Sequence, residues 1–144
     1  MMRKDAANDE ENRIVLHADG IVWNGGMPCV SMGYFGANSN IGGARYWTLK
    51  VGTGSYYKTA VPVTIGQTAL LALKIVFGPT NTISLYVNPG SLGGEEPAAA
   101  DASASTTSGI AFKSLAFYGG SSTNQSSIDE IRFGGTYADV TPVQ

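Results

Sequence analysis

The sequence predicts an all-β protein, built as a two-sheet antiparallel sandwich. Short apolar segments are separated by turn residues about every eight to twelve positions, which is the strand spacing of sandwiches and barrels. Charged residues make up only 14% of the chain, against about 25% in typical domains. Gly, with 19 residues, is frequent. A chain of 144 residues with this composition is most simply one domain without long helices.

We expect eight strands, because eight segments are rich in β-branched, aromatic or other apolar residues and are bounded by turn residues. The polar stretches between them, including 89–108 and 119–126, are expected to be loops. The expected strands are Arg13–His17, Met27–Tyr34, Arg45–Val51, Ser55–Val61, Thr68–Phe77, Ile83–Asn88, Gly109–Tyr118 and Ser127–Gly134.

The segment Thr68–Val76 is the one with a helical alternative, because Ala69 to Lys74 have good helix propensity. The strand interpretation is favoured for two reasons. Ile75, Val76 and Phe77 are strand formers, and the residues after Gly78 continue as the second strand of a hairpin.

The N-terminal residues 1–12 are polar and charged, and we expect them to form a solvated tail before a single domain over 13–144. They lack the apolar run of a signal peptide. Two interpretations of the compartment stay open: an intracellular protein, or part of a longer secreted protein whose leader lies upstream. The net charge of −2 argues against a nucleic-acid partner, and no run approaches the roughly 20 apolar residues of a membrane helix.

Cys29 is the only cysteine, so an internal disulfide framework is excluded. We interpret it as a small hydrophobic residue within a strand. A reactive thiol would need a basic partner, and the sequence does not place the only histidine, His17, near it.

The second half of the chain carries a family resemblance. Its pieces are individually only strand patterns, but they occur in a definite order over about residues 68–142. The pieces are Leu73–Phe77, Ile83–Pro89, Glu95–Pro97, Ile128–Gly134 and Tyr137–Pro142. In that order they resemble the concanavalin A-like, laminin-G-like jelly rolls of secreted and surface proteins of environmental bacteria.

The resemblance implies a jelly-roll sandwich that commonly binds carbohydrate or protein. Full domains of this kind are usually longer, so we expect one or two early strands to be absent here. An incomplete sheet would leave an exposed edge, which a partner subunit could cover.

The same family includes glycosidases, which need two carboxyl groups about 5–5.5 Å apart for a retaining mechanism. Glu95-Glu96 and Asp129-Glu130 are sequence neighbours, and neighbours in a strand point to opposite faces. Neither pair can form such a site within one strand, and no Gly-x-Ser-x-Gly elbow is present. We therefore expect no enzymatic activity and no catalytic residue.

Asp129 and Glu130 are the weak candidates for a metal site, since carboxylate oxygens are ligands for Ca²⁺. The structural alternative is favoured: Asp129 would bind backbone amides, and Glu130 would pair with a Lys or Arg of a neighbouring strand. No other cofactor is indicated. Asp139 is interpreted as a turn or cap residue.

Aromatic side chains are the best ligand candidates, because pockets combine an apolar wall with a few polar groups. Tyr46 and Trp47 lie on opposite faces of one strand, so one is expected in the core and one outside. The core alternative is favoured for Trp47, which would leave Tyr46 and one of Tyr56 or Tyr57 exposed. The full set of candidate ligand-binding residues is Trp23, Asn38, Asn40, Tyr46, Trp47, Tyr56 and Tyr57.

The leading hypothesis is a non-catalytic recognition module that binds carbohydrate by stacking on aromatic rings and by hydrogen bonds from Asn, Ser and Thr. The alternative is a structural or protein-interaction domain, a homodimer formed by edge-strand pairing, without a sugar site. A third hypothesis is an atypical glycoside hydrolase or lyase.

Overall fold

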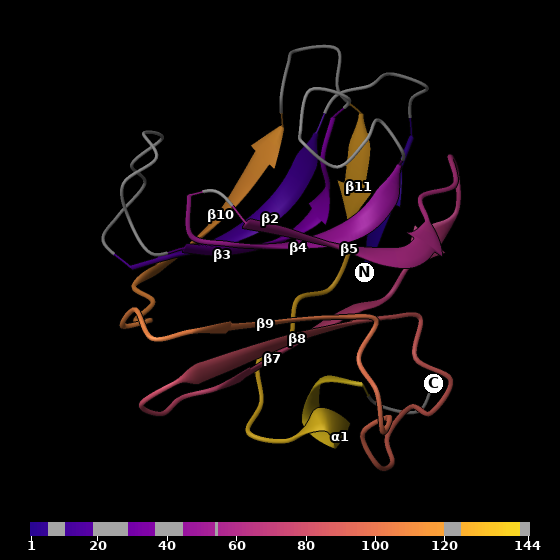
Figure 1. Ribbon diagram of the computed structural model, residues 1–144. Helices are drawn as coiled ribbons and strands as arrows, with labels where there is room; N and C mark the ends of the chain where they lie inside the picture. Colours follow the sequence, from indigo (N-terminus) through magenta and orange to yellow (C-terminus); the bar gives the residue numbers. More distant parts are fainter. Residues whose placement is uncertain (6–10, 19–28, 37–44, 54, 120–124, 142–144) are drawn as a thin grey trace.

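A computed structural model describes residues 1–5, 11–18, 29–36, 45–53, 55–119 and 125–141. Over these residues the protein is all-β with three antiparallel sheets and one short helix, which confirms the predicted class. In Figure 1 the largest sheet lies above a three-stranded sheet, and the helix lies below the latter.

The strands fall into one five-stranded and two three-stranded sheets. The five-stranded sheet has the order β10 (Ser114–Gly119), β2 (Asn12–His17), β3 (Cys29–Tyr34), β4 (Tyr46–Val51) and β5 (Ser55–Pro62). The sheet stacked against it contains β7 (Leu71–Val76), β8 (Asn81–Val87) and β9 (Ala102–Thr106). The third sheet contains β11 (Ser126–Ile128), β1 (Met2–Lys4) and β6 (Thr68–Ala69).

The core lies between the two stacked sheets and is built by alternate residues of their strands. Leu49 of β4 meets Ile83 and Leu85 of β8 in one cluster, and all three are fully buried. Burial of each such side chain stabilises the fold by about 1.5–3 kcal/mol. Tyr34 packs edge to face on Trp47, with ring centroids 6.0 Å apart.

The segment 68–77 is extended, as predicted, but it is divided between two sheets. β6 and β7 are separated by Leu70, whose backbone N–H donates to the Asn88 side chain at 2.9 Å. The backbone N–H of Asn88 in turn donates to the Leu70 carbonyl at 2.8 Å. Asn88, with a φ of 49°, thus satisfies the backbone of Leu70 where the strand leaves one sheet and enters the other.

The expected N-terminal tail is wrong for its first residues, because Met2–Lys4 form β1. Met2 lies opposite Ile128 of β11 and Ala69 of β6, and it is almost fully buried. Lys4 is also buried, with its Nζ 5.0 Å from the centre of the Tyr34 ring. The sequence did not predict this strand because Met2 is its single apolar residue.

A second strand, β9, lies in the expected loop 89–108. Its inward residues are Ala102 and Ala104, which are buried, whereas Ser103 and Ser105 are exposed. Buried and exposed residues therefore alternate as in other strands, but the residues are small and have low β-propensity. β9 pairs with β8 over Asn81–Leu85.

The last two expected strands are shorter than predicted. β10 starts only at Ser114, and β11 ends at Ile128, two residues before Glu130 adopts a φ of 52°. The chain then leads to α1 (Tyr137–Val140), which the sequence did not predict. Asp139 has the expected capping role, because it exchanges hydrogen bonds with the N-cap Thr136. No helix in the described residues has the length and apolar character needed to cross a membrane.

Gly33 of β3 generates a test of this architecture. A Cβ at this position would overlap the carbonyl oxygen of Asn12 and lie 2.7 Å from the Cα of Arg13, and the φ of 154° disfavours a side chain. We expect Gly33→Ala to destabilise the protein by about 3 kcal/mol, lowering the melting temperature by about 10 °C in a thermal melt.

Gly90→Ala is the matched control for this substitution, because a Cβ there meets no atom within 4 Å. Its free energy of unfolding should stay within about 0.5 kcal/mol of the original. Equal melting temperatures for the two variants would show that β2 and β3 do not approach each other as described.

Candidate functional site

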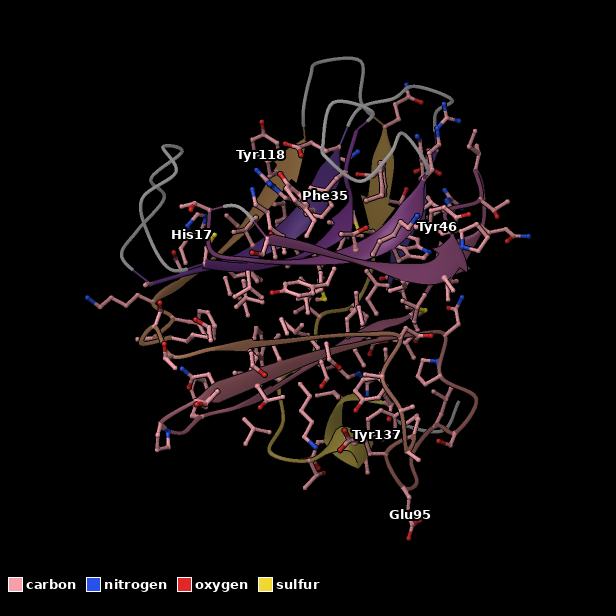
Figure 2. The ribbon with its side chains drawn as sticks, viewed as in Figure 1. His17, Phe35, Tyr46, Glu95, Tyr118 and Tyr137 are labelled. Atoms are coloured by element: carbon pink, nitrogen blue, oxygen red, sulfur yellow. The ribbon has the colours of Figure 1, made fainter. Side chains whose placement is uncertain are left out.

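The candidate site is the side of the five-stranded sheet that faces away from β7, β8 and β9. Figure 2 shows Phe35, Tyr46 and Tyr118 on this side. The strand register brings further residues to it, because directly opposed residues of an antiparallel pair share a face. We call this surface the outer aromatic face and define it by Arg13, Phe35, Tyr46, Lys50, Tyr56, Lys58 and Tyr118.

Arg13 of β2 lies between two rings of this face. Its guanidinium carbon is 4.4 Å from the centre of the Tyr118 ring and 5.4 Å from that of Phe35. One guanidinium nitrogen is 3.5 Å from a carboxylate oxygen of Glu11. Contacts of this kind contribute about 0.5–2 kcal/mol each, so the two rings hold the guanidinium in place.

Lys50 and Lys58 extend the same arrangement across β4 and β5. The Nζ of Lys50 is 4.8 Å from the centre of the Tyr56 ring, and the Nζ of Lys58 is 4.6 Å from that of Tyr46. Tyr56 also meets Phe35 edge to face, with centroids 5.1 Å apart. Aromatic rings and cations are therefore interspersed from β10 to β5, and the Phe35 and Tyr56 rings touch each other.

The floor beneath these rings is tightly packed. Ser31 and Thr48 point to the outer side of the sheet and yet are buried, with exposures of 1% and 0%. The Thr48 hydroxyl donates to the Tyr46 carbonyl at 3.0 Å. Tyr46 and Tyr56 are themselves only half-buried. Their partly exposed rings therefore lie on the buried layer that contains Ser31 and Thr48.

The predicted ligand residues of β4 and β5 divide between the two sides of the sheet. Tyr46 and Tyr56 lie on the outer aromatic face. Trp47 is only 2% exposed and belongs to the core, as the favoured alternative predicted, so it is corrected as a ligand-binding candidate. Tyr57 lies opposite Leu49 on the inner side and packs against the core, so it does not share a face with Tyr56.

Three other predicted ligand residues, Trp23, Asn38 and Asn40, lie outside the described residues. The structure instead adds Arg13, Phe35 and Tyr118, which the sequence analysis did not select for a site. Arg13 and Tyr118 are more than 100 positions apart and become neighbours only through the pairing of β2 with β10. No local sequence signal reports that pairing.

His17 and Cys29 are directly opposed on β2 and β3, which the sequence could not establish. The Cys29 thiol is 3.7 Å from the Gly52 carbonyl oxygen, to which it donates. The thiol is thus directed at a backbone carbonyl.

Of the two weak metal candidates, Glu130 has another partner for its carboxylate. Asp129 exchanges backbone hydrogen bonds with the N-terminal Met1. The Glu130 carboxylate pairs with Arg132, two residues further along the same segment. The expected ion pair of Glu130 with a neighbouring strand is therefore corrected. Within the ranges that the structure describes, no group of three or more His, Cys, Asp or Glu could hold a metal ion.

A second polar cluster lies on the opposite side of the molecule, between the β7–β8–β9 sheet and α1. The Tyr86 hydroxyl donates to Glu96, and the Nζ of Lys74 is 2.6 Å from the other carboxylate oxygen. Tyr137 of α1 packs edge to face on Tyr86 at 6.0 Å and donates to the Ser91 carbonyl at 2.8 Å. With these contacts Tyr86 is only 5% exposed.

This second cluster perturbs two ionisable groups. Burial, and then the hydrogen bond to Glu96, raises the pKa of Tyr86 to about 12. The hydrogen bonds from Lys74 and Tyr86 lower the pKa of Glu96. These hydrogen bonds fasten the loop that contains Ser91 and Glu96 onto β7, β8 and α1. We therefore interpret the cluster as structural.

Comparison of the chain with protein-family models, curated proteins and solved structures gave no match. The assignment of a function therefore depends on the geometry of the outer aromatic face.

The raised pKa of Tyr86 predicts an alkaline transition. A group whose pKa is higher in the folded state contributes stability that is complete below its unfolded pKa, about 10 for Tyr. That contribution is lost as the pH rises from about 10 towards about 12. Burial raises the pKa of Tyr34 as well, so titration of tyrosinate absorbance should show a late step that is smaller in Tyr86→Phe.

Tyr137→Phe is the matched control, because it removes a neighbouring hydroxyl of the same cluster that donates to a backbone carbonyl. It should retain the late step. Titration of Tyr86 near pH 10 would show that its hydroxyl is not buried against Glu96.

Proposed function

We propose that this chain is a non-catalytic recognition module that binds carbohydrate on the outer aromatic face. The observation that carries the proposal is the presence of three half-buried rings, Tyr46, Tyr56 and Tyr118, on one side of the five-stranded sheet. A saccharide presents apolar C–H faces, which suit flat rings that are already fixed in position. Fixed rings lose little conformational entropy when a ligand covers them.

The cations of the same face complement these rings. Arg13, Lys50 and Lys58 each lie within 5.4 Å of a ring centre, so a sugar stacked on a ring would bring its hydroxyl oxygens near an N–H donor. Charged donors form the stronger hydrogen bonds. The combination of an apolar wall and a few placed donors is that of a ligand site.

The distribution of carboxylates favours binding without catalysis. Among the described residues, Glu11 is the carboxylate that pairs with a residue of the outer aromatic face, through Arg13. A retaining glycosidase would need a second carboxyl group about 5–5.5 Å away. Glu95, Glu96 and Asp139 belong to the other side of the molecule, with α1.

We further propose that the two stacked sheets form the jelly-roll sandwich expected from the family resemblance. Two connections support this topology. The chain passes from β6 in one sheet to β7 in another across a single residue, and it crosses between the stacked sheets from β9 to β10. Such crossovers between antiparallel sheets are typical of Greek-key folds.

A glycan array followed by calorimetric titration with the best ligand tests the function. We expect Tyr46→Ala and Tyr56→Ala each to weaken binding about tenfold or more, or about 1.4 kcal/mol, because a covered ring acts as an anchor. Both rings are only half-buried, so the variants should remain folded in a thermal melt.

Tyr137→Ala is the matched control, since this half-buried tyrosine belongs to α1 on the opposite side of the molecule. It should leave the affinity unchanged. The proposal fails if no glycan binds, or if the Tyr46→Ala/Tyr56→Ala double variant binds as tightly as the original protein.

A further inference from the structure

A second, apolar space lies between the stacked sheets, on the inner side of the five-stranded sheet and thus away from the outer aromatic face. Its volume is about 630 Å³, within the range of roughly 300–1,000 Å³ typical of ligand pockets. Both sheets supply walls, and the space also extends past β7 to Ala72, Leu92 and Val140 on the side of α1. The main contributors are Ile14, Leu16 and Met32 of β2 and β3, and Leu71, Leu73 and Ile75 of β7.

The space is elongated along β7. Its lining includes β7 residues from Leu71 to Ile75 and continues to Phe77, and six residue steps of a strand span about 20 Å. Phe77 meets Phe112 at one end, with ring centroids 6.3 Å apart. We call this space the inter-sheet groove.

The rim of the inter-sheet groove is formed by the segment 130–134, which runs from β11 towards α1 (Figure 1). Its Ile131 and Phe133 side chains line the groove and yet are 40% and 75% exposed. Glu130 and Arg132 are the charged side chains of the described lining, and they pair with each other. The N-terminal ammonium group of Met1 adds a third charge beside them, where it donates to the Asp129 and Glu130 carbonyls. The groove is therefore mainly apolar, with its charges gathered at this rim.

The chemistry of the walls selects the occupant. The walls are sheet faces, which present side chains, whereas the backbone N–H and C=O groups point along the sheet to neighbouring strands. A peptide inserted between them could pair on one side with β7, which is an edge strand of its sheet over the described residues, but its other backbone groups would be left without partners, at a considerable cost. A hydrocarbon chain has no such groups.

We propose that the inter-sheet groove binds a linear acyl chain, whose polar head group stays in water beside Arg132. The elongated shape, the apolar walls on both sheets and the restriction of charge to the rim support this ligand class. This second site goes beyond carbohydrate recognition and does not depend on it.

The test is calorimetric titration of the full chain with saturated monocarboxylates from octanoate to hexadecanoate, each kept below its micelle concentration. Every methylene that enters the groove should tighten binding about fourfold, until the chain length exceeds the groove and the affinity levels off. An affinity that does not rise with chain length overturns the proposal.

Two substitutions within the groove separate specific binding from adsorption. Leu73→Phe adds volume to the wall and should abolish binding of the longest acyl chains. Ile75→Ala widens the groove and should move the plateau to longer acyl chains. If Leu73→Phe does not fold, Ile75→Ala decides alone, and an unchanged plateau in a folded variant contradicts the proposal.

Val76→Ala is the matched control, because Val76 is the next residue of β7, is 49% exposed and does not line the groove. It should bind as the original protein does. Sedimentation with phosphatidylcholine and phosphatidylglycerol vesicles distinguishes an acyl chain drawn from a bilayer from a free carboxylate; either source supports the acyl site.

Light scattering tests the competing occupant, a second copy of this chain. A stable dimer that binds none of the carboxylates would show that the partner copy covers the groove, and the proposal would then be wrong. A monomer with the expected length dependence supports it.

Discussion

Alternation of side chains along β4 is the constraint on which the other parts depend. Trp47 and Leu49 enter the core beneath the five-stranded sheet, where Leu49 is fully buried. Because successive residues of a strand point to opposite faces, Tyr46, Thr48 and Lys50 must then face outward. A shift of one residue would exchange the two sets, so the packing that stabilises the core also determines which rings can meet a ligand.

The sequence was sufficient where large apolar residues alternate along a strand that stays within one sheet. β4 and β8 were predicted at nearly their observed bounds, and the core alternative for Trp47 follows from the same alternation. The expected strand Thr68–Phe77 missed the break at Leu70, and the last two expected strands were too long. The prediction failed where the pattern uses other residues. β9 alternates Ala with Ser, and in β1 one methionine is followed by Arg3 and Lys4, so neither strand has enough apolar area to be recognised locally.

The outer aromatic face could be predicted only in part, for a different reason. Tyr46 and Tyr56 were identified because hairpin neighbours are close in sequence. Arg13 and Tyr118 are brought together by the pairing of β2 with β10, across nearly the whole chain. Local propensities contain no term for such pairing, and its energy comes from the completed sheet. A long-range site of this kind therefore needs coordinates.

The unequal side chains at the two edges of the β7–β8–β9 sheet give the core the shape of a wedge. At one edge Ala102 and Ala104 let β9 approach β4 and β5 to within 8 Å between Cα atoms. At the other edge the larger Leu71, Leu73 and Ile75 of β7 line open space. The wide spacing of the two sheets at β7 is thus set partly by the small Ala102 and Ala104 side chains, which keep the spacing narrow at β9.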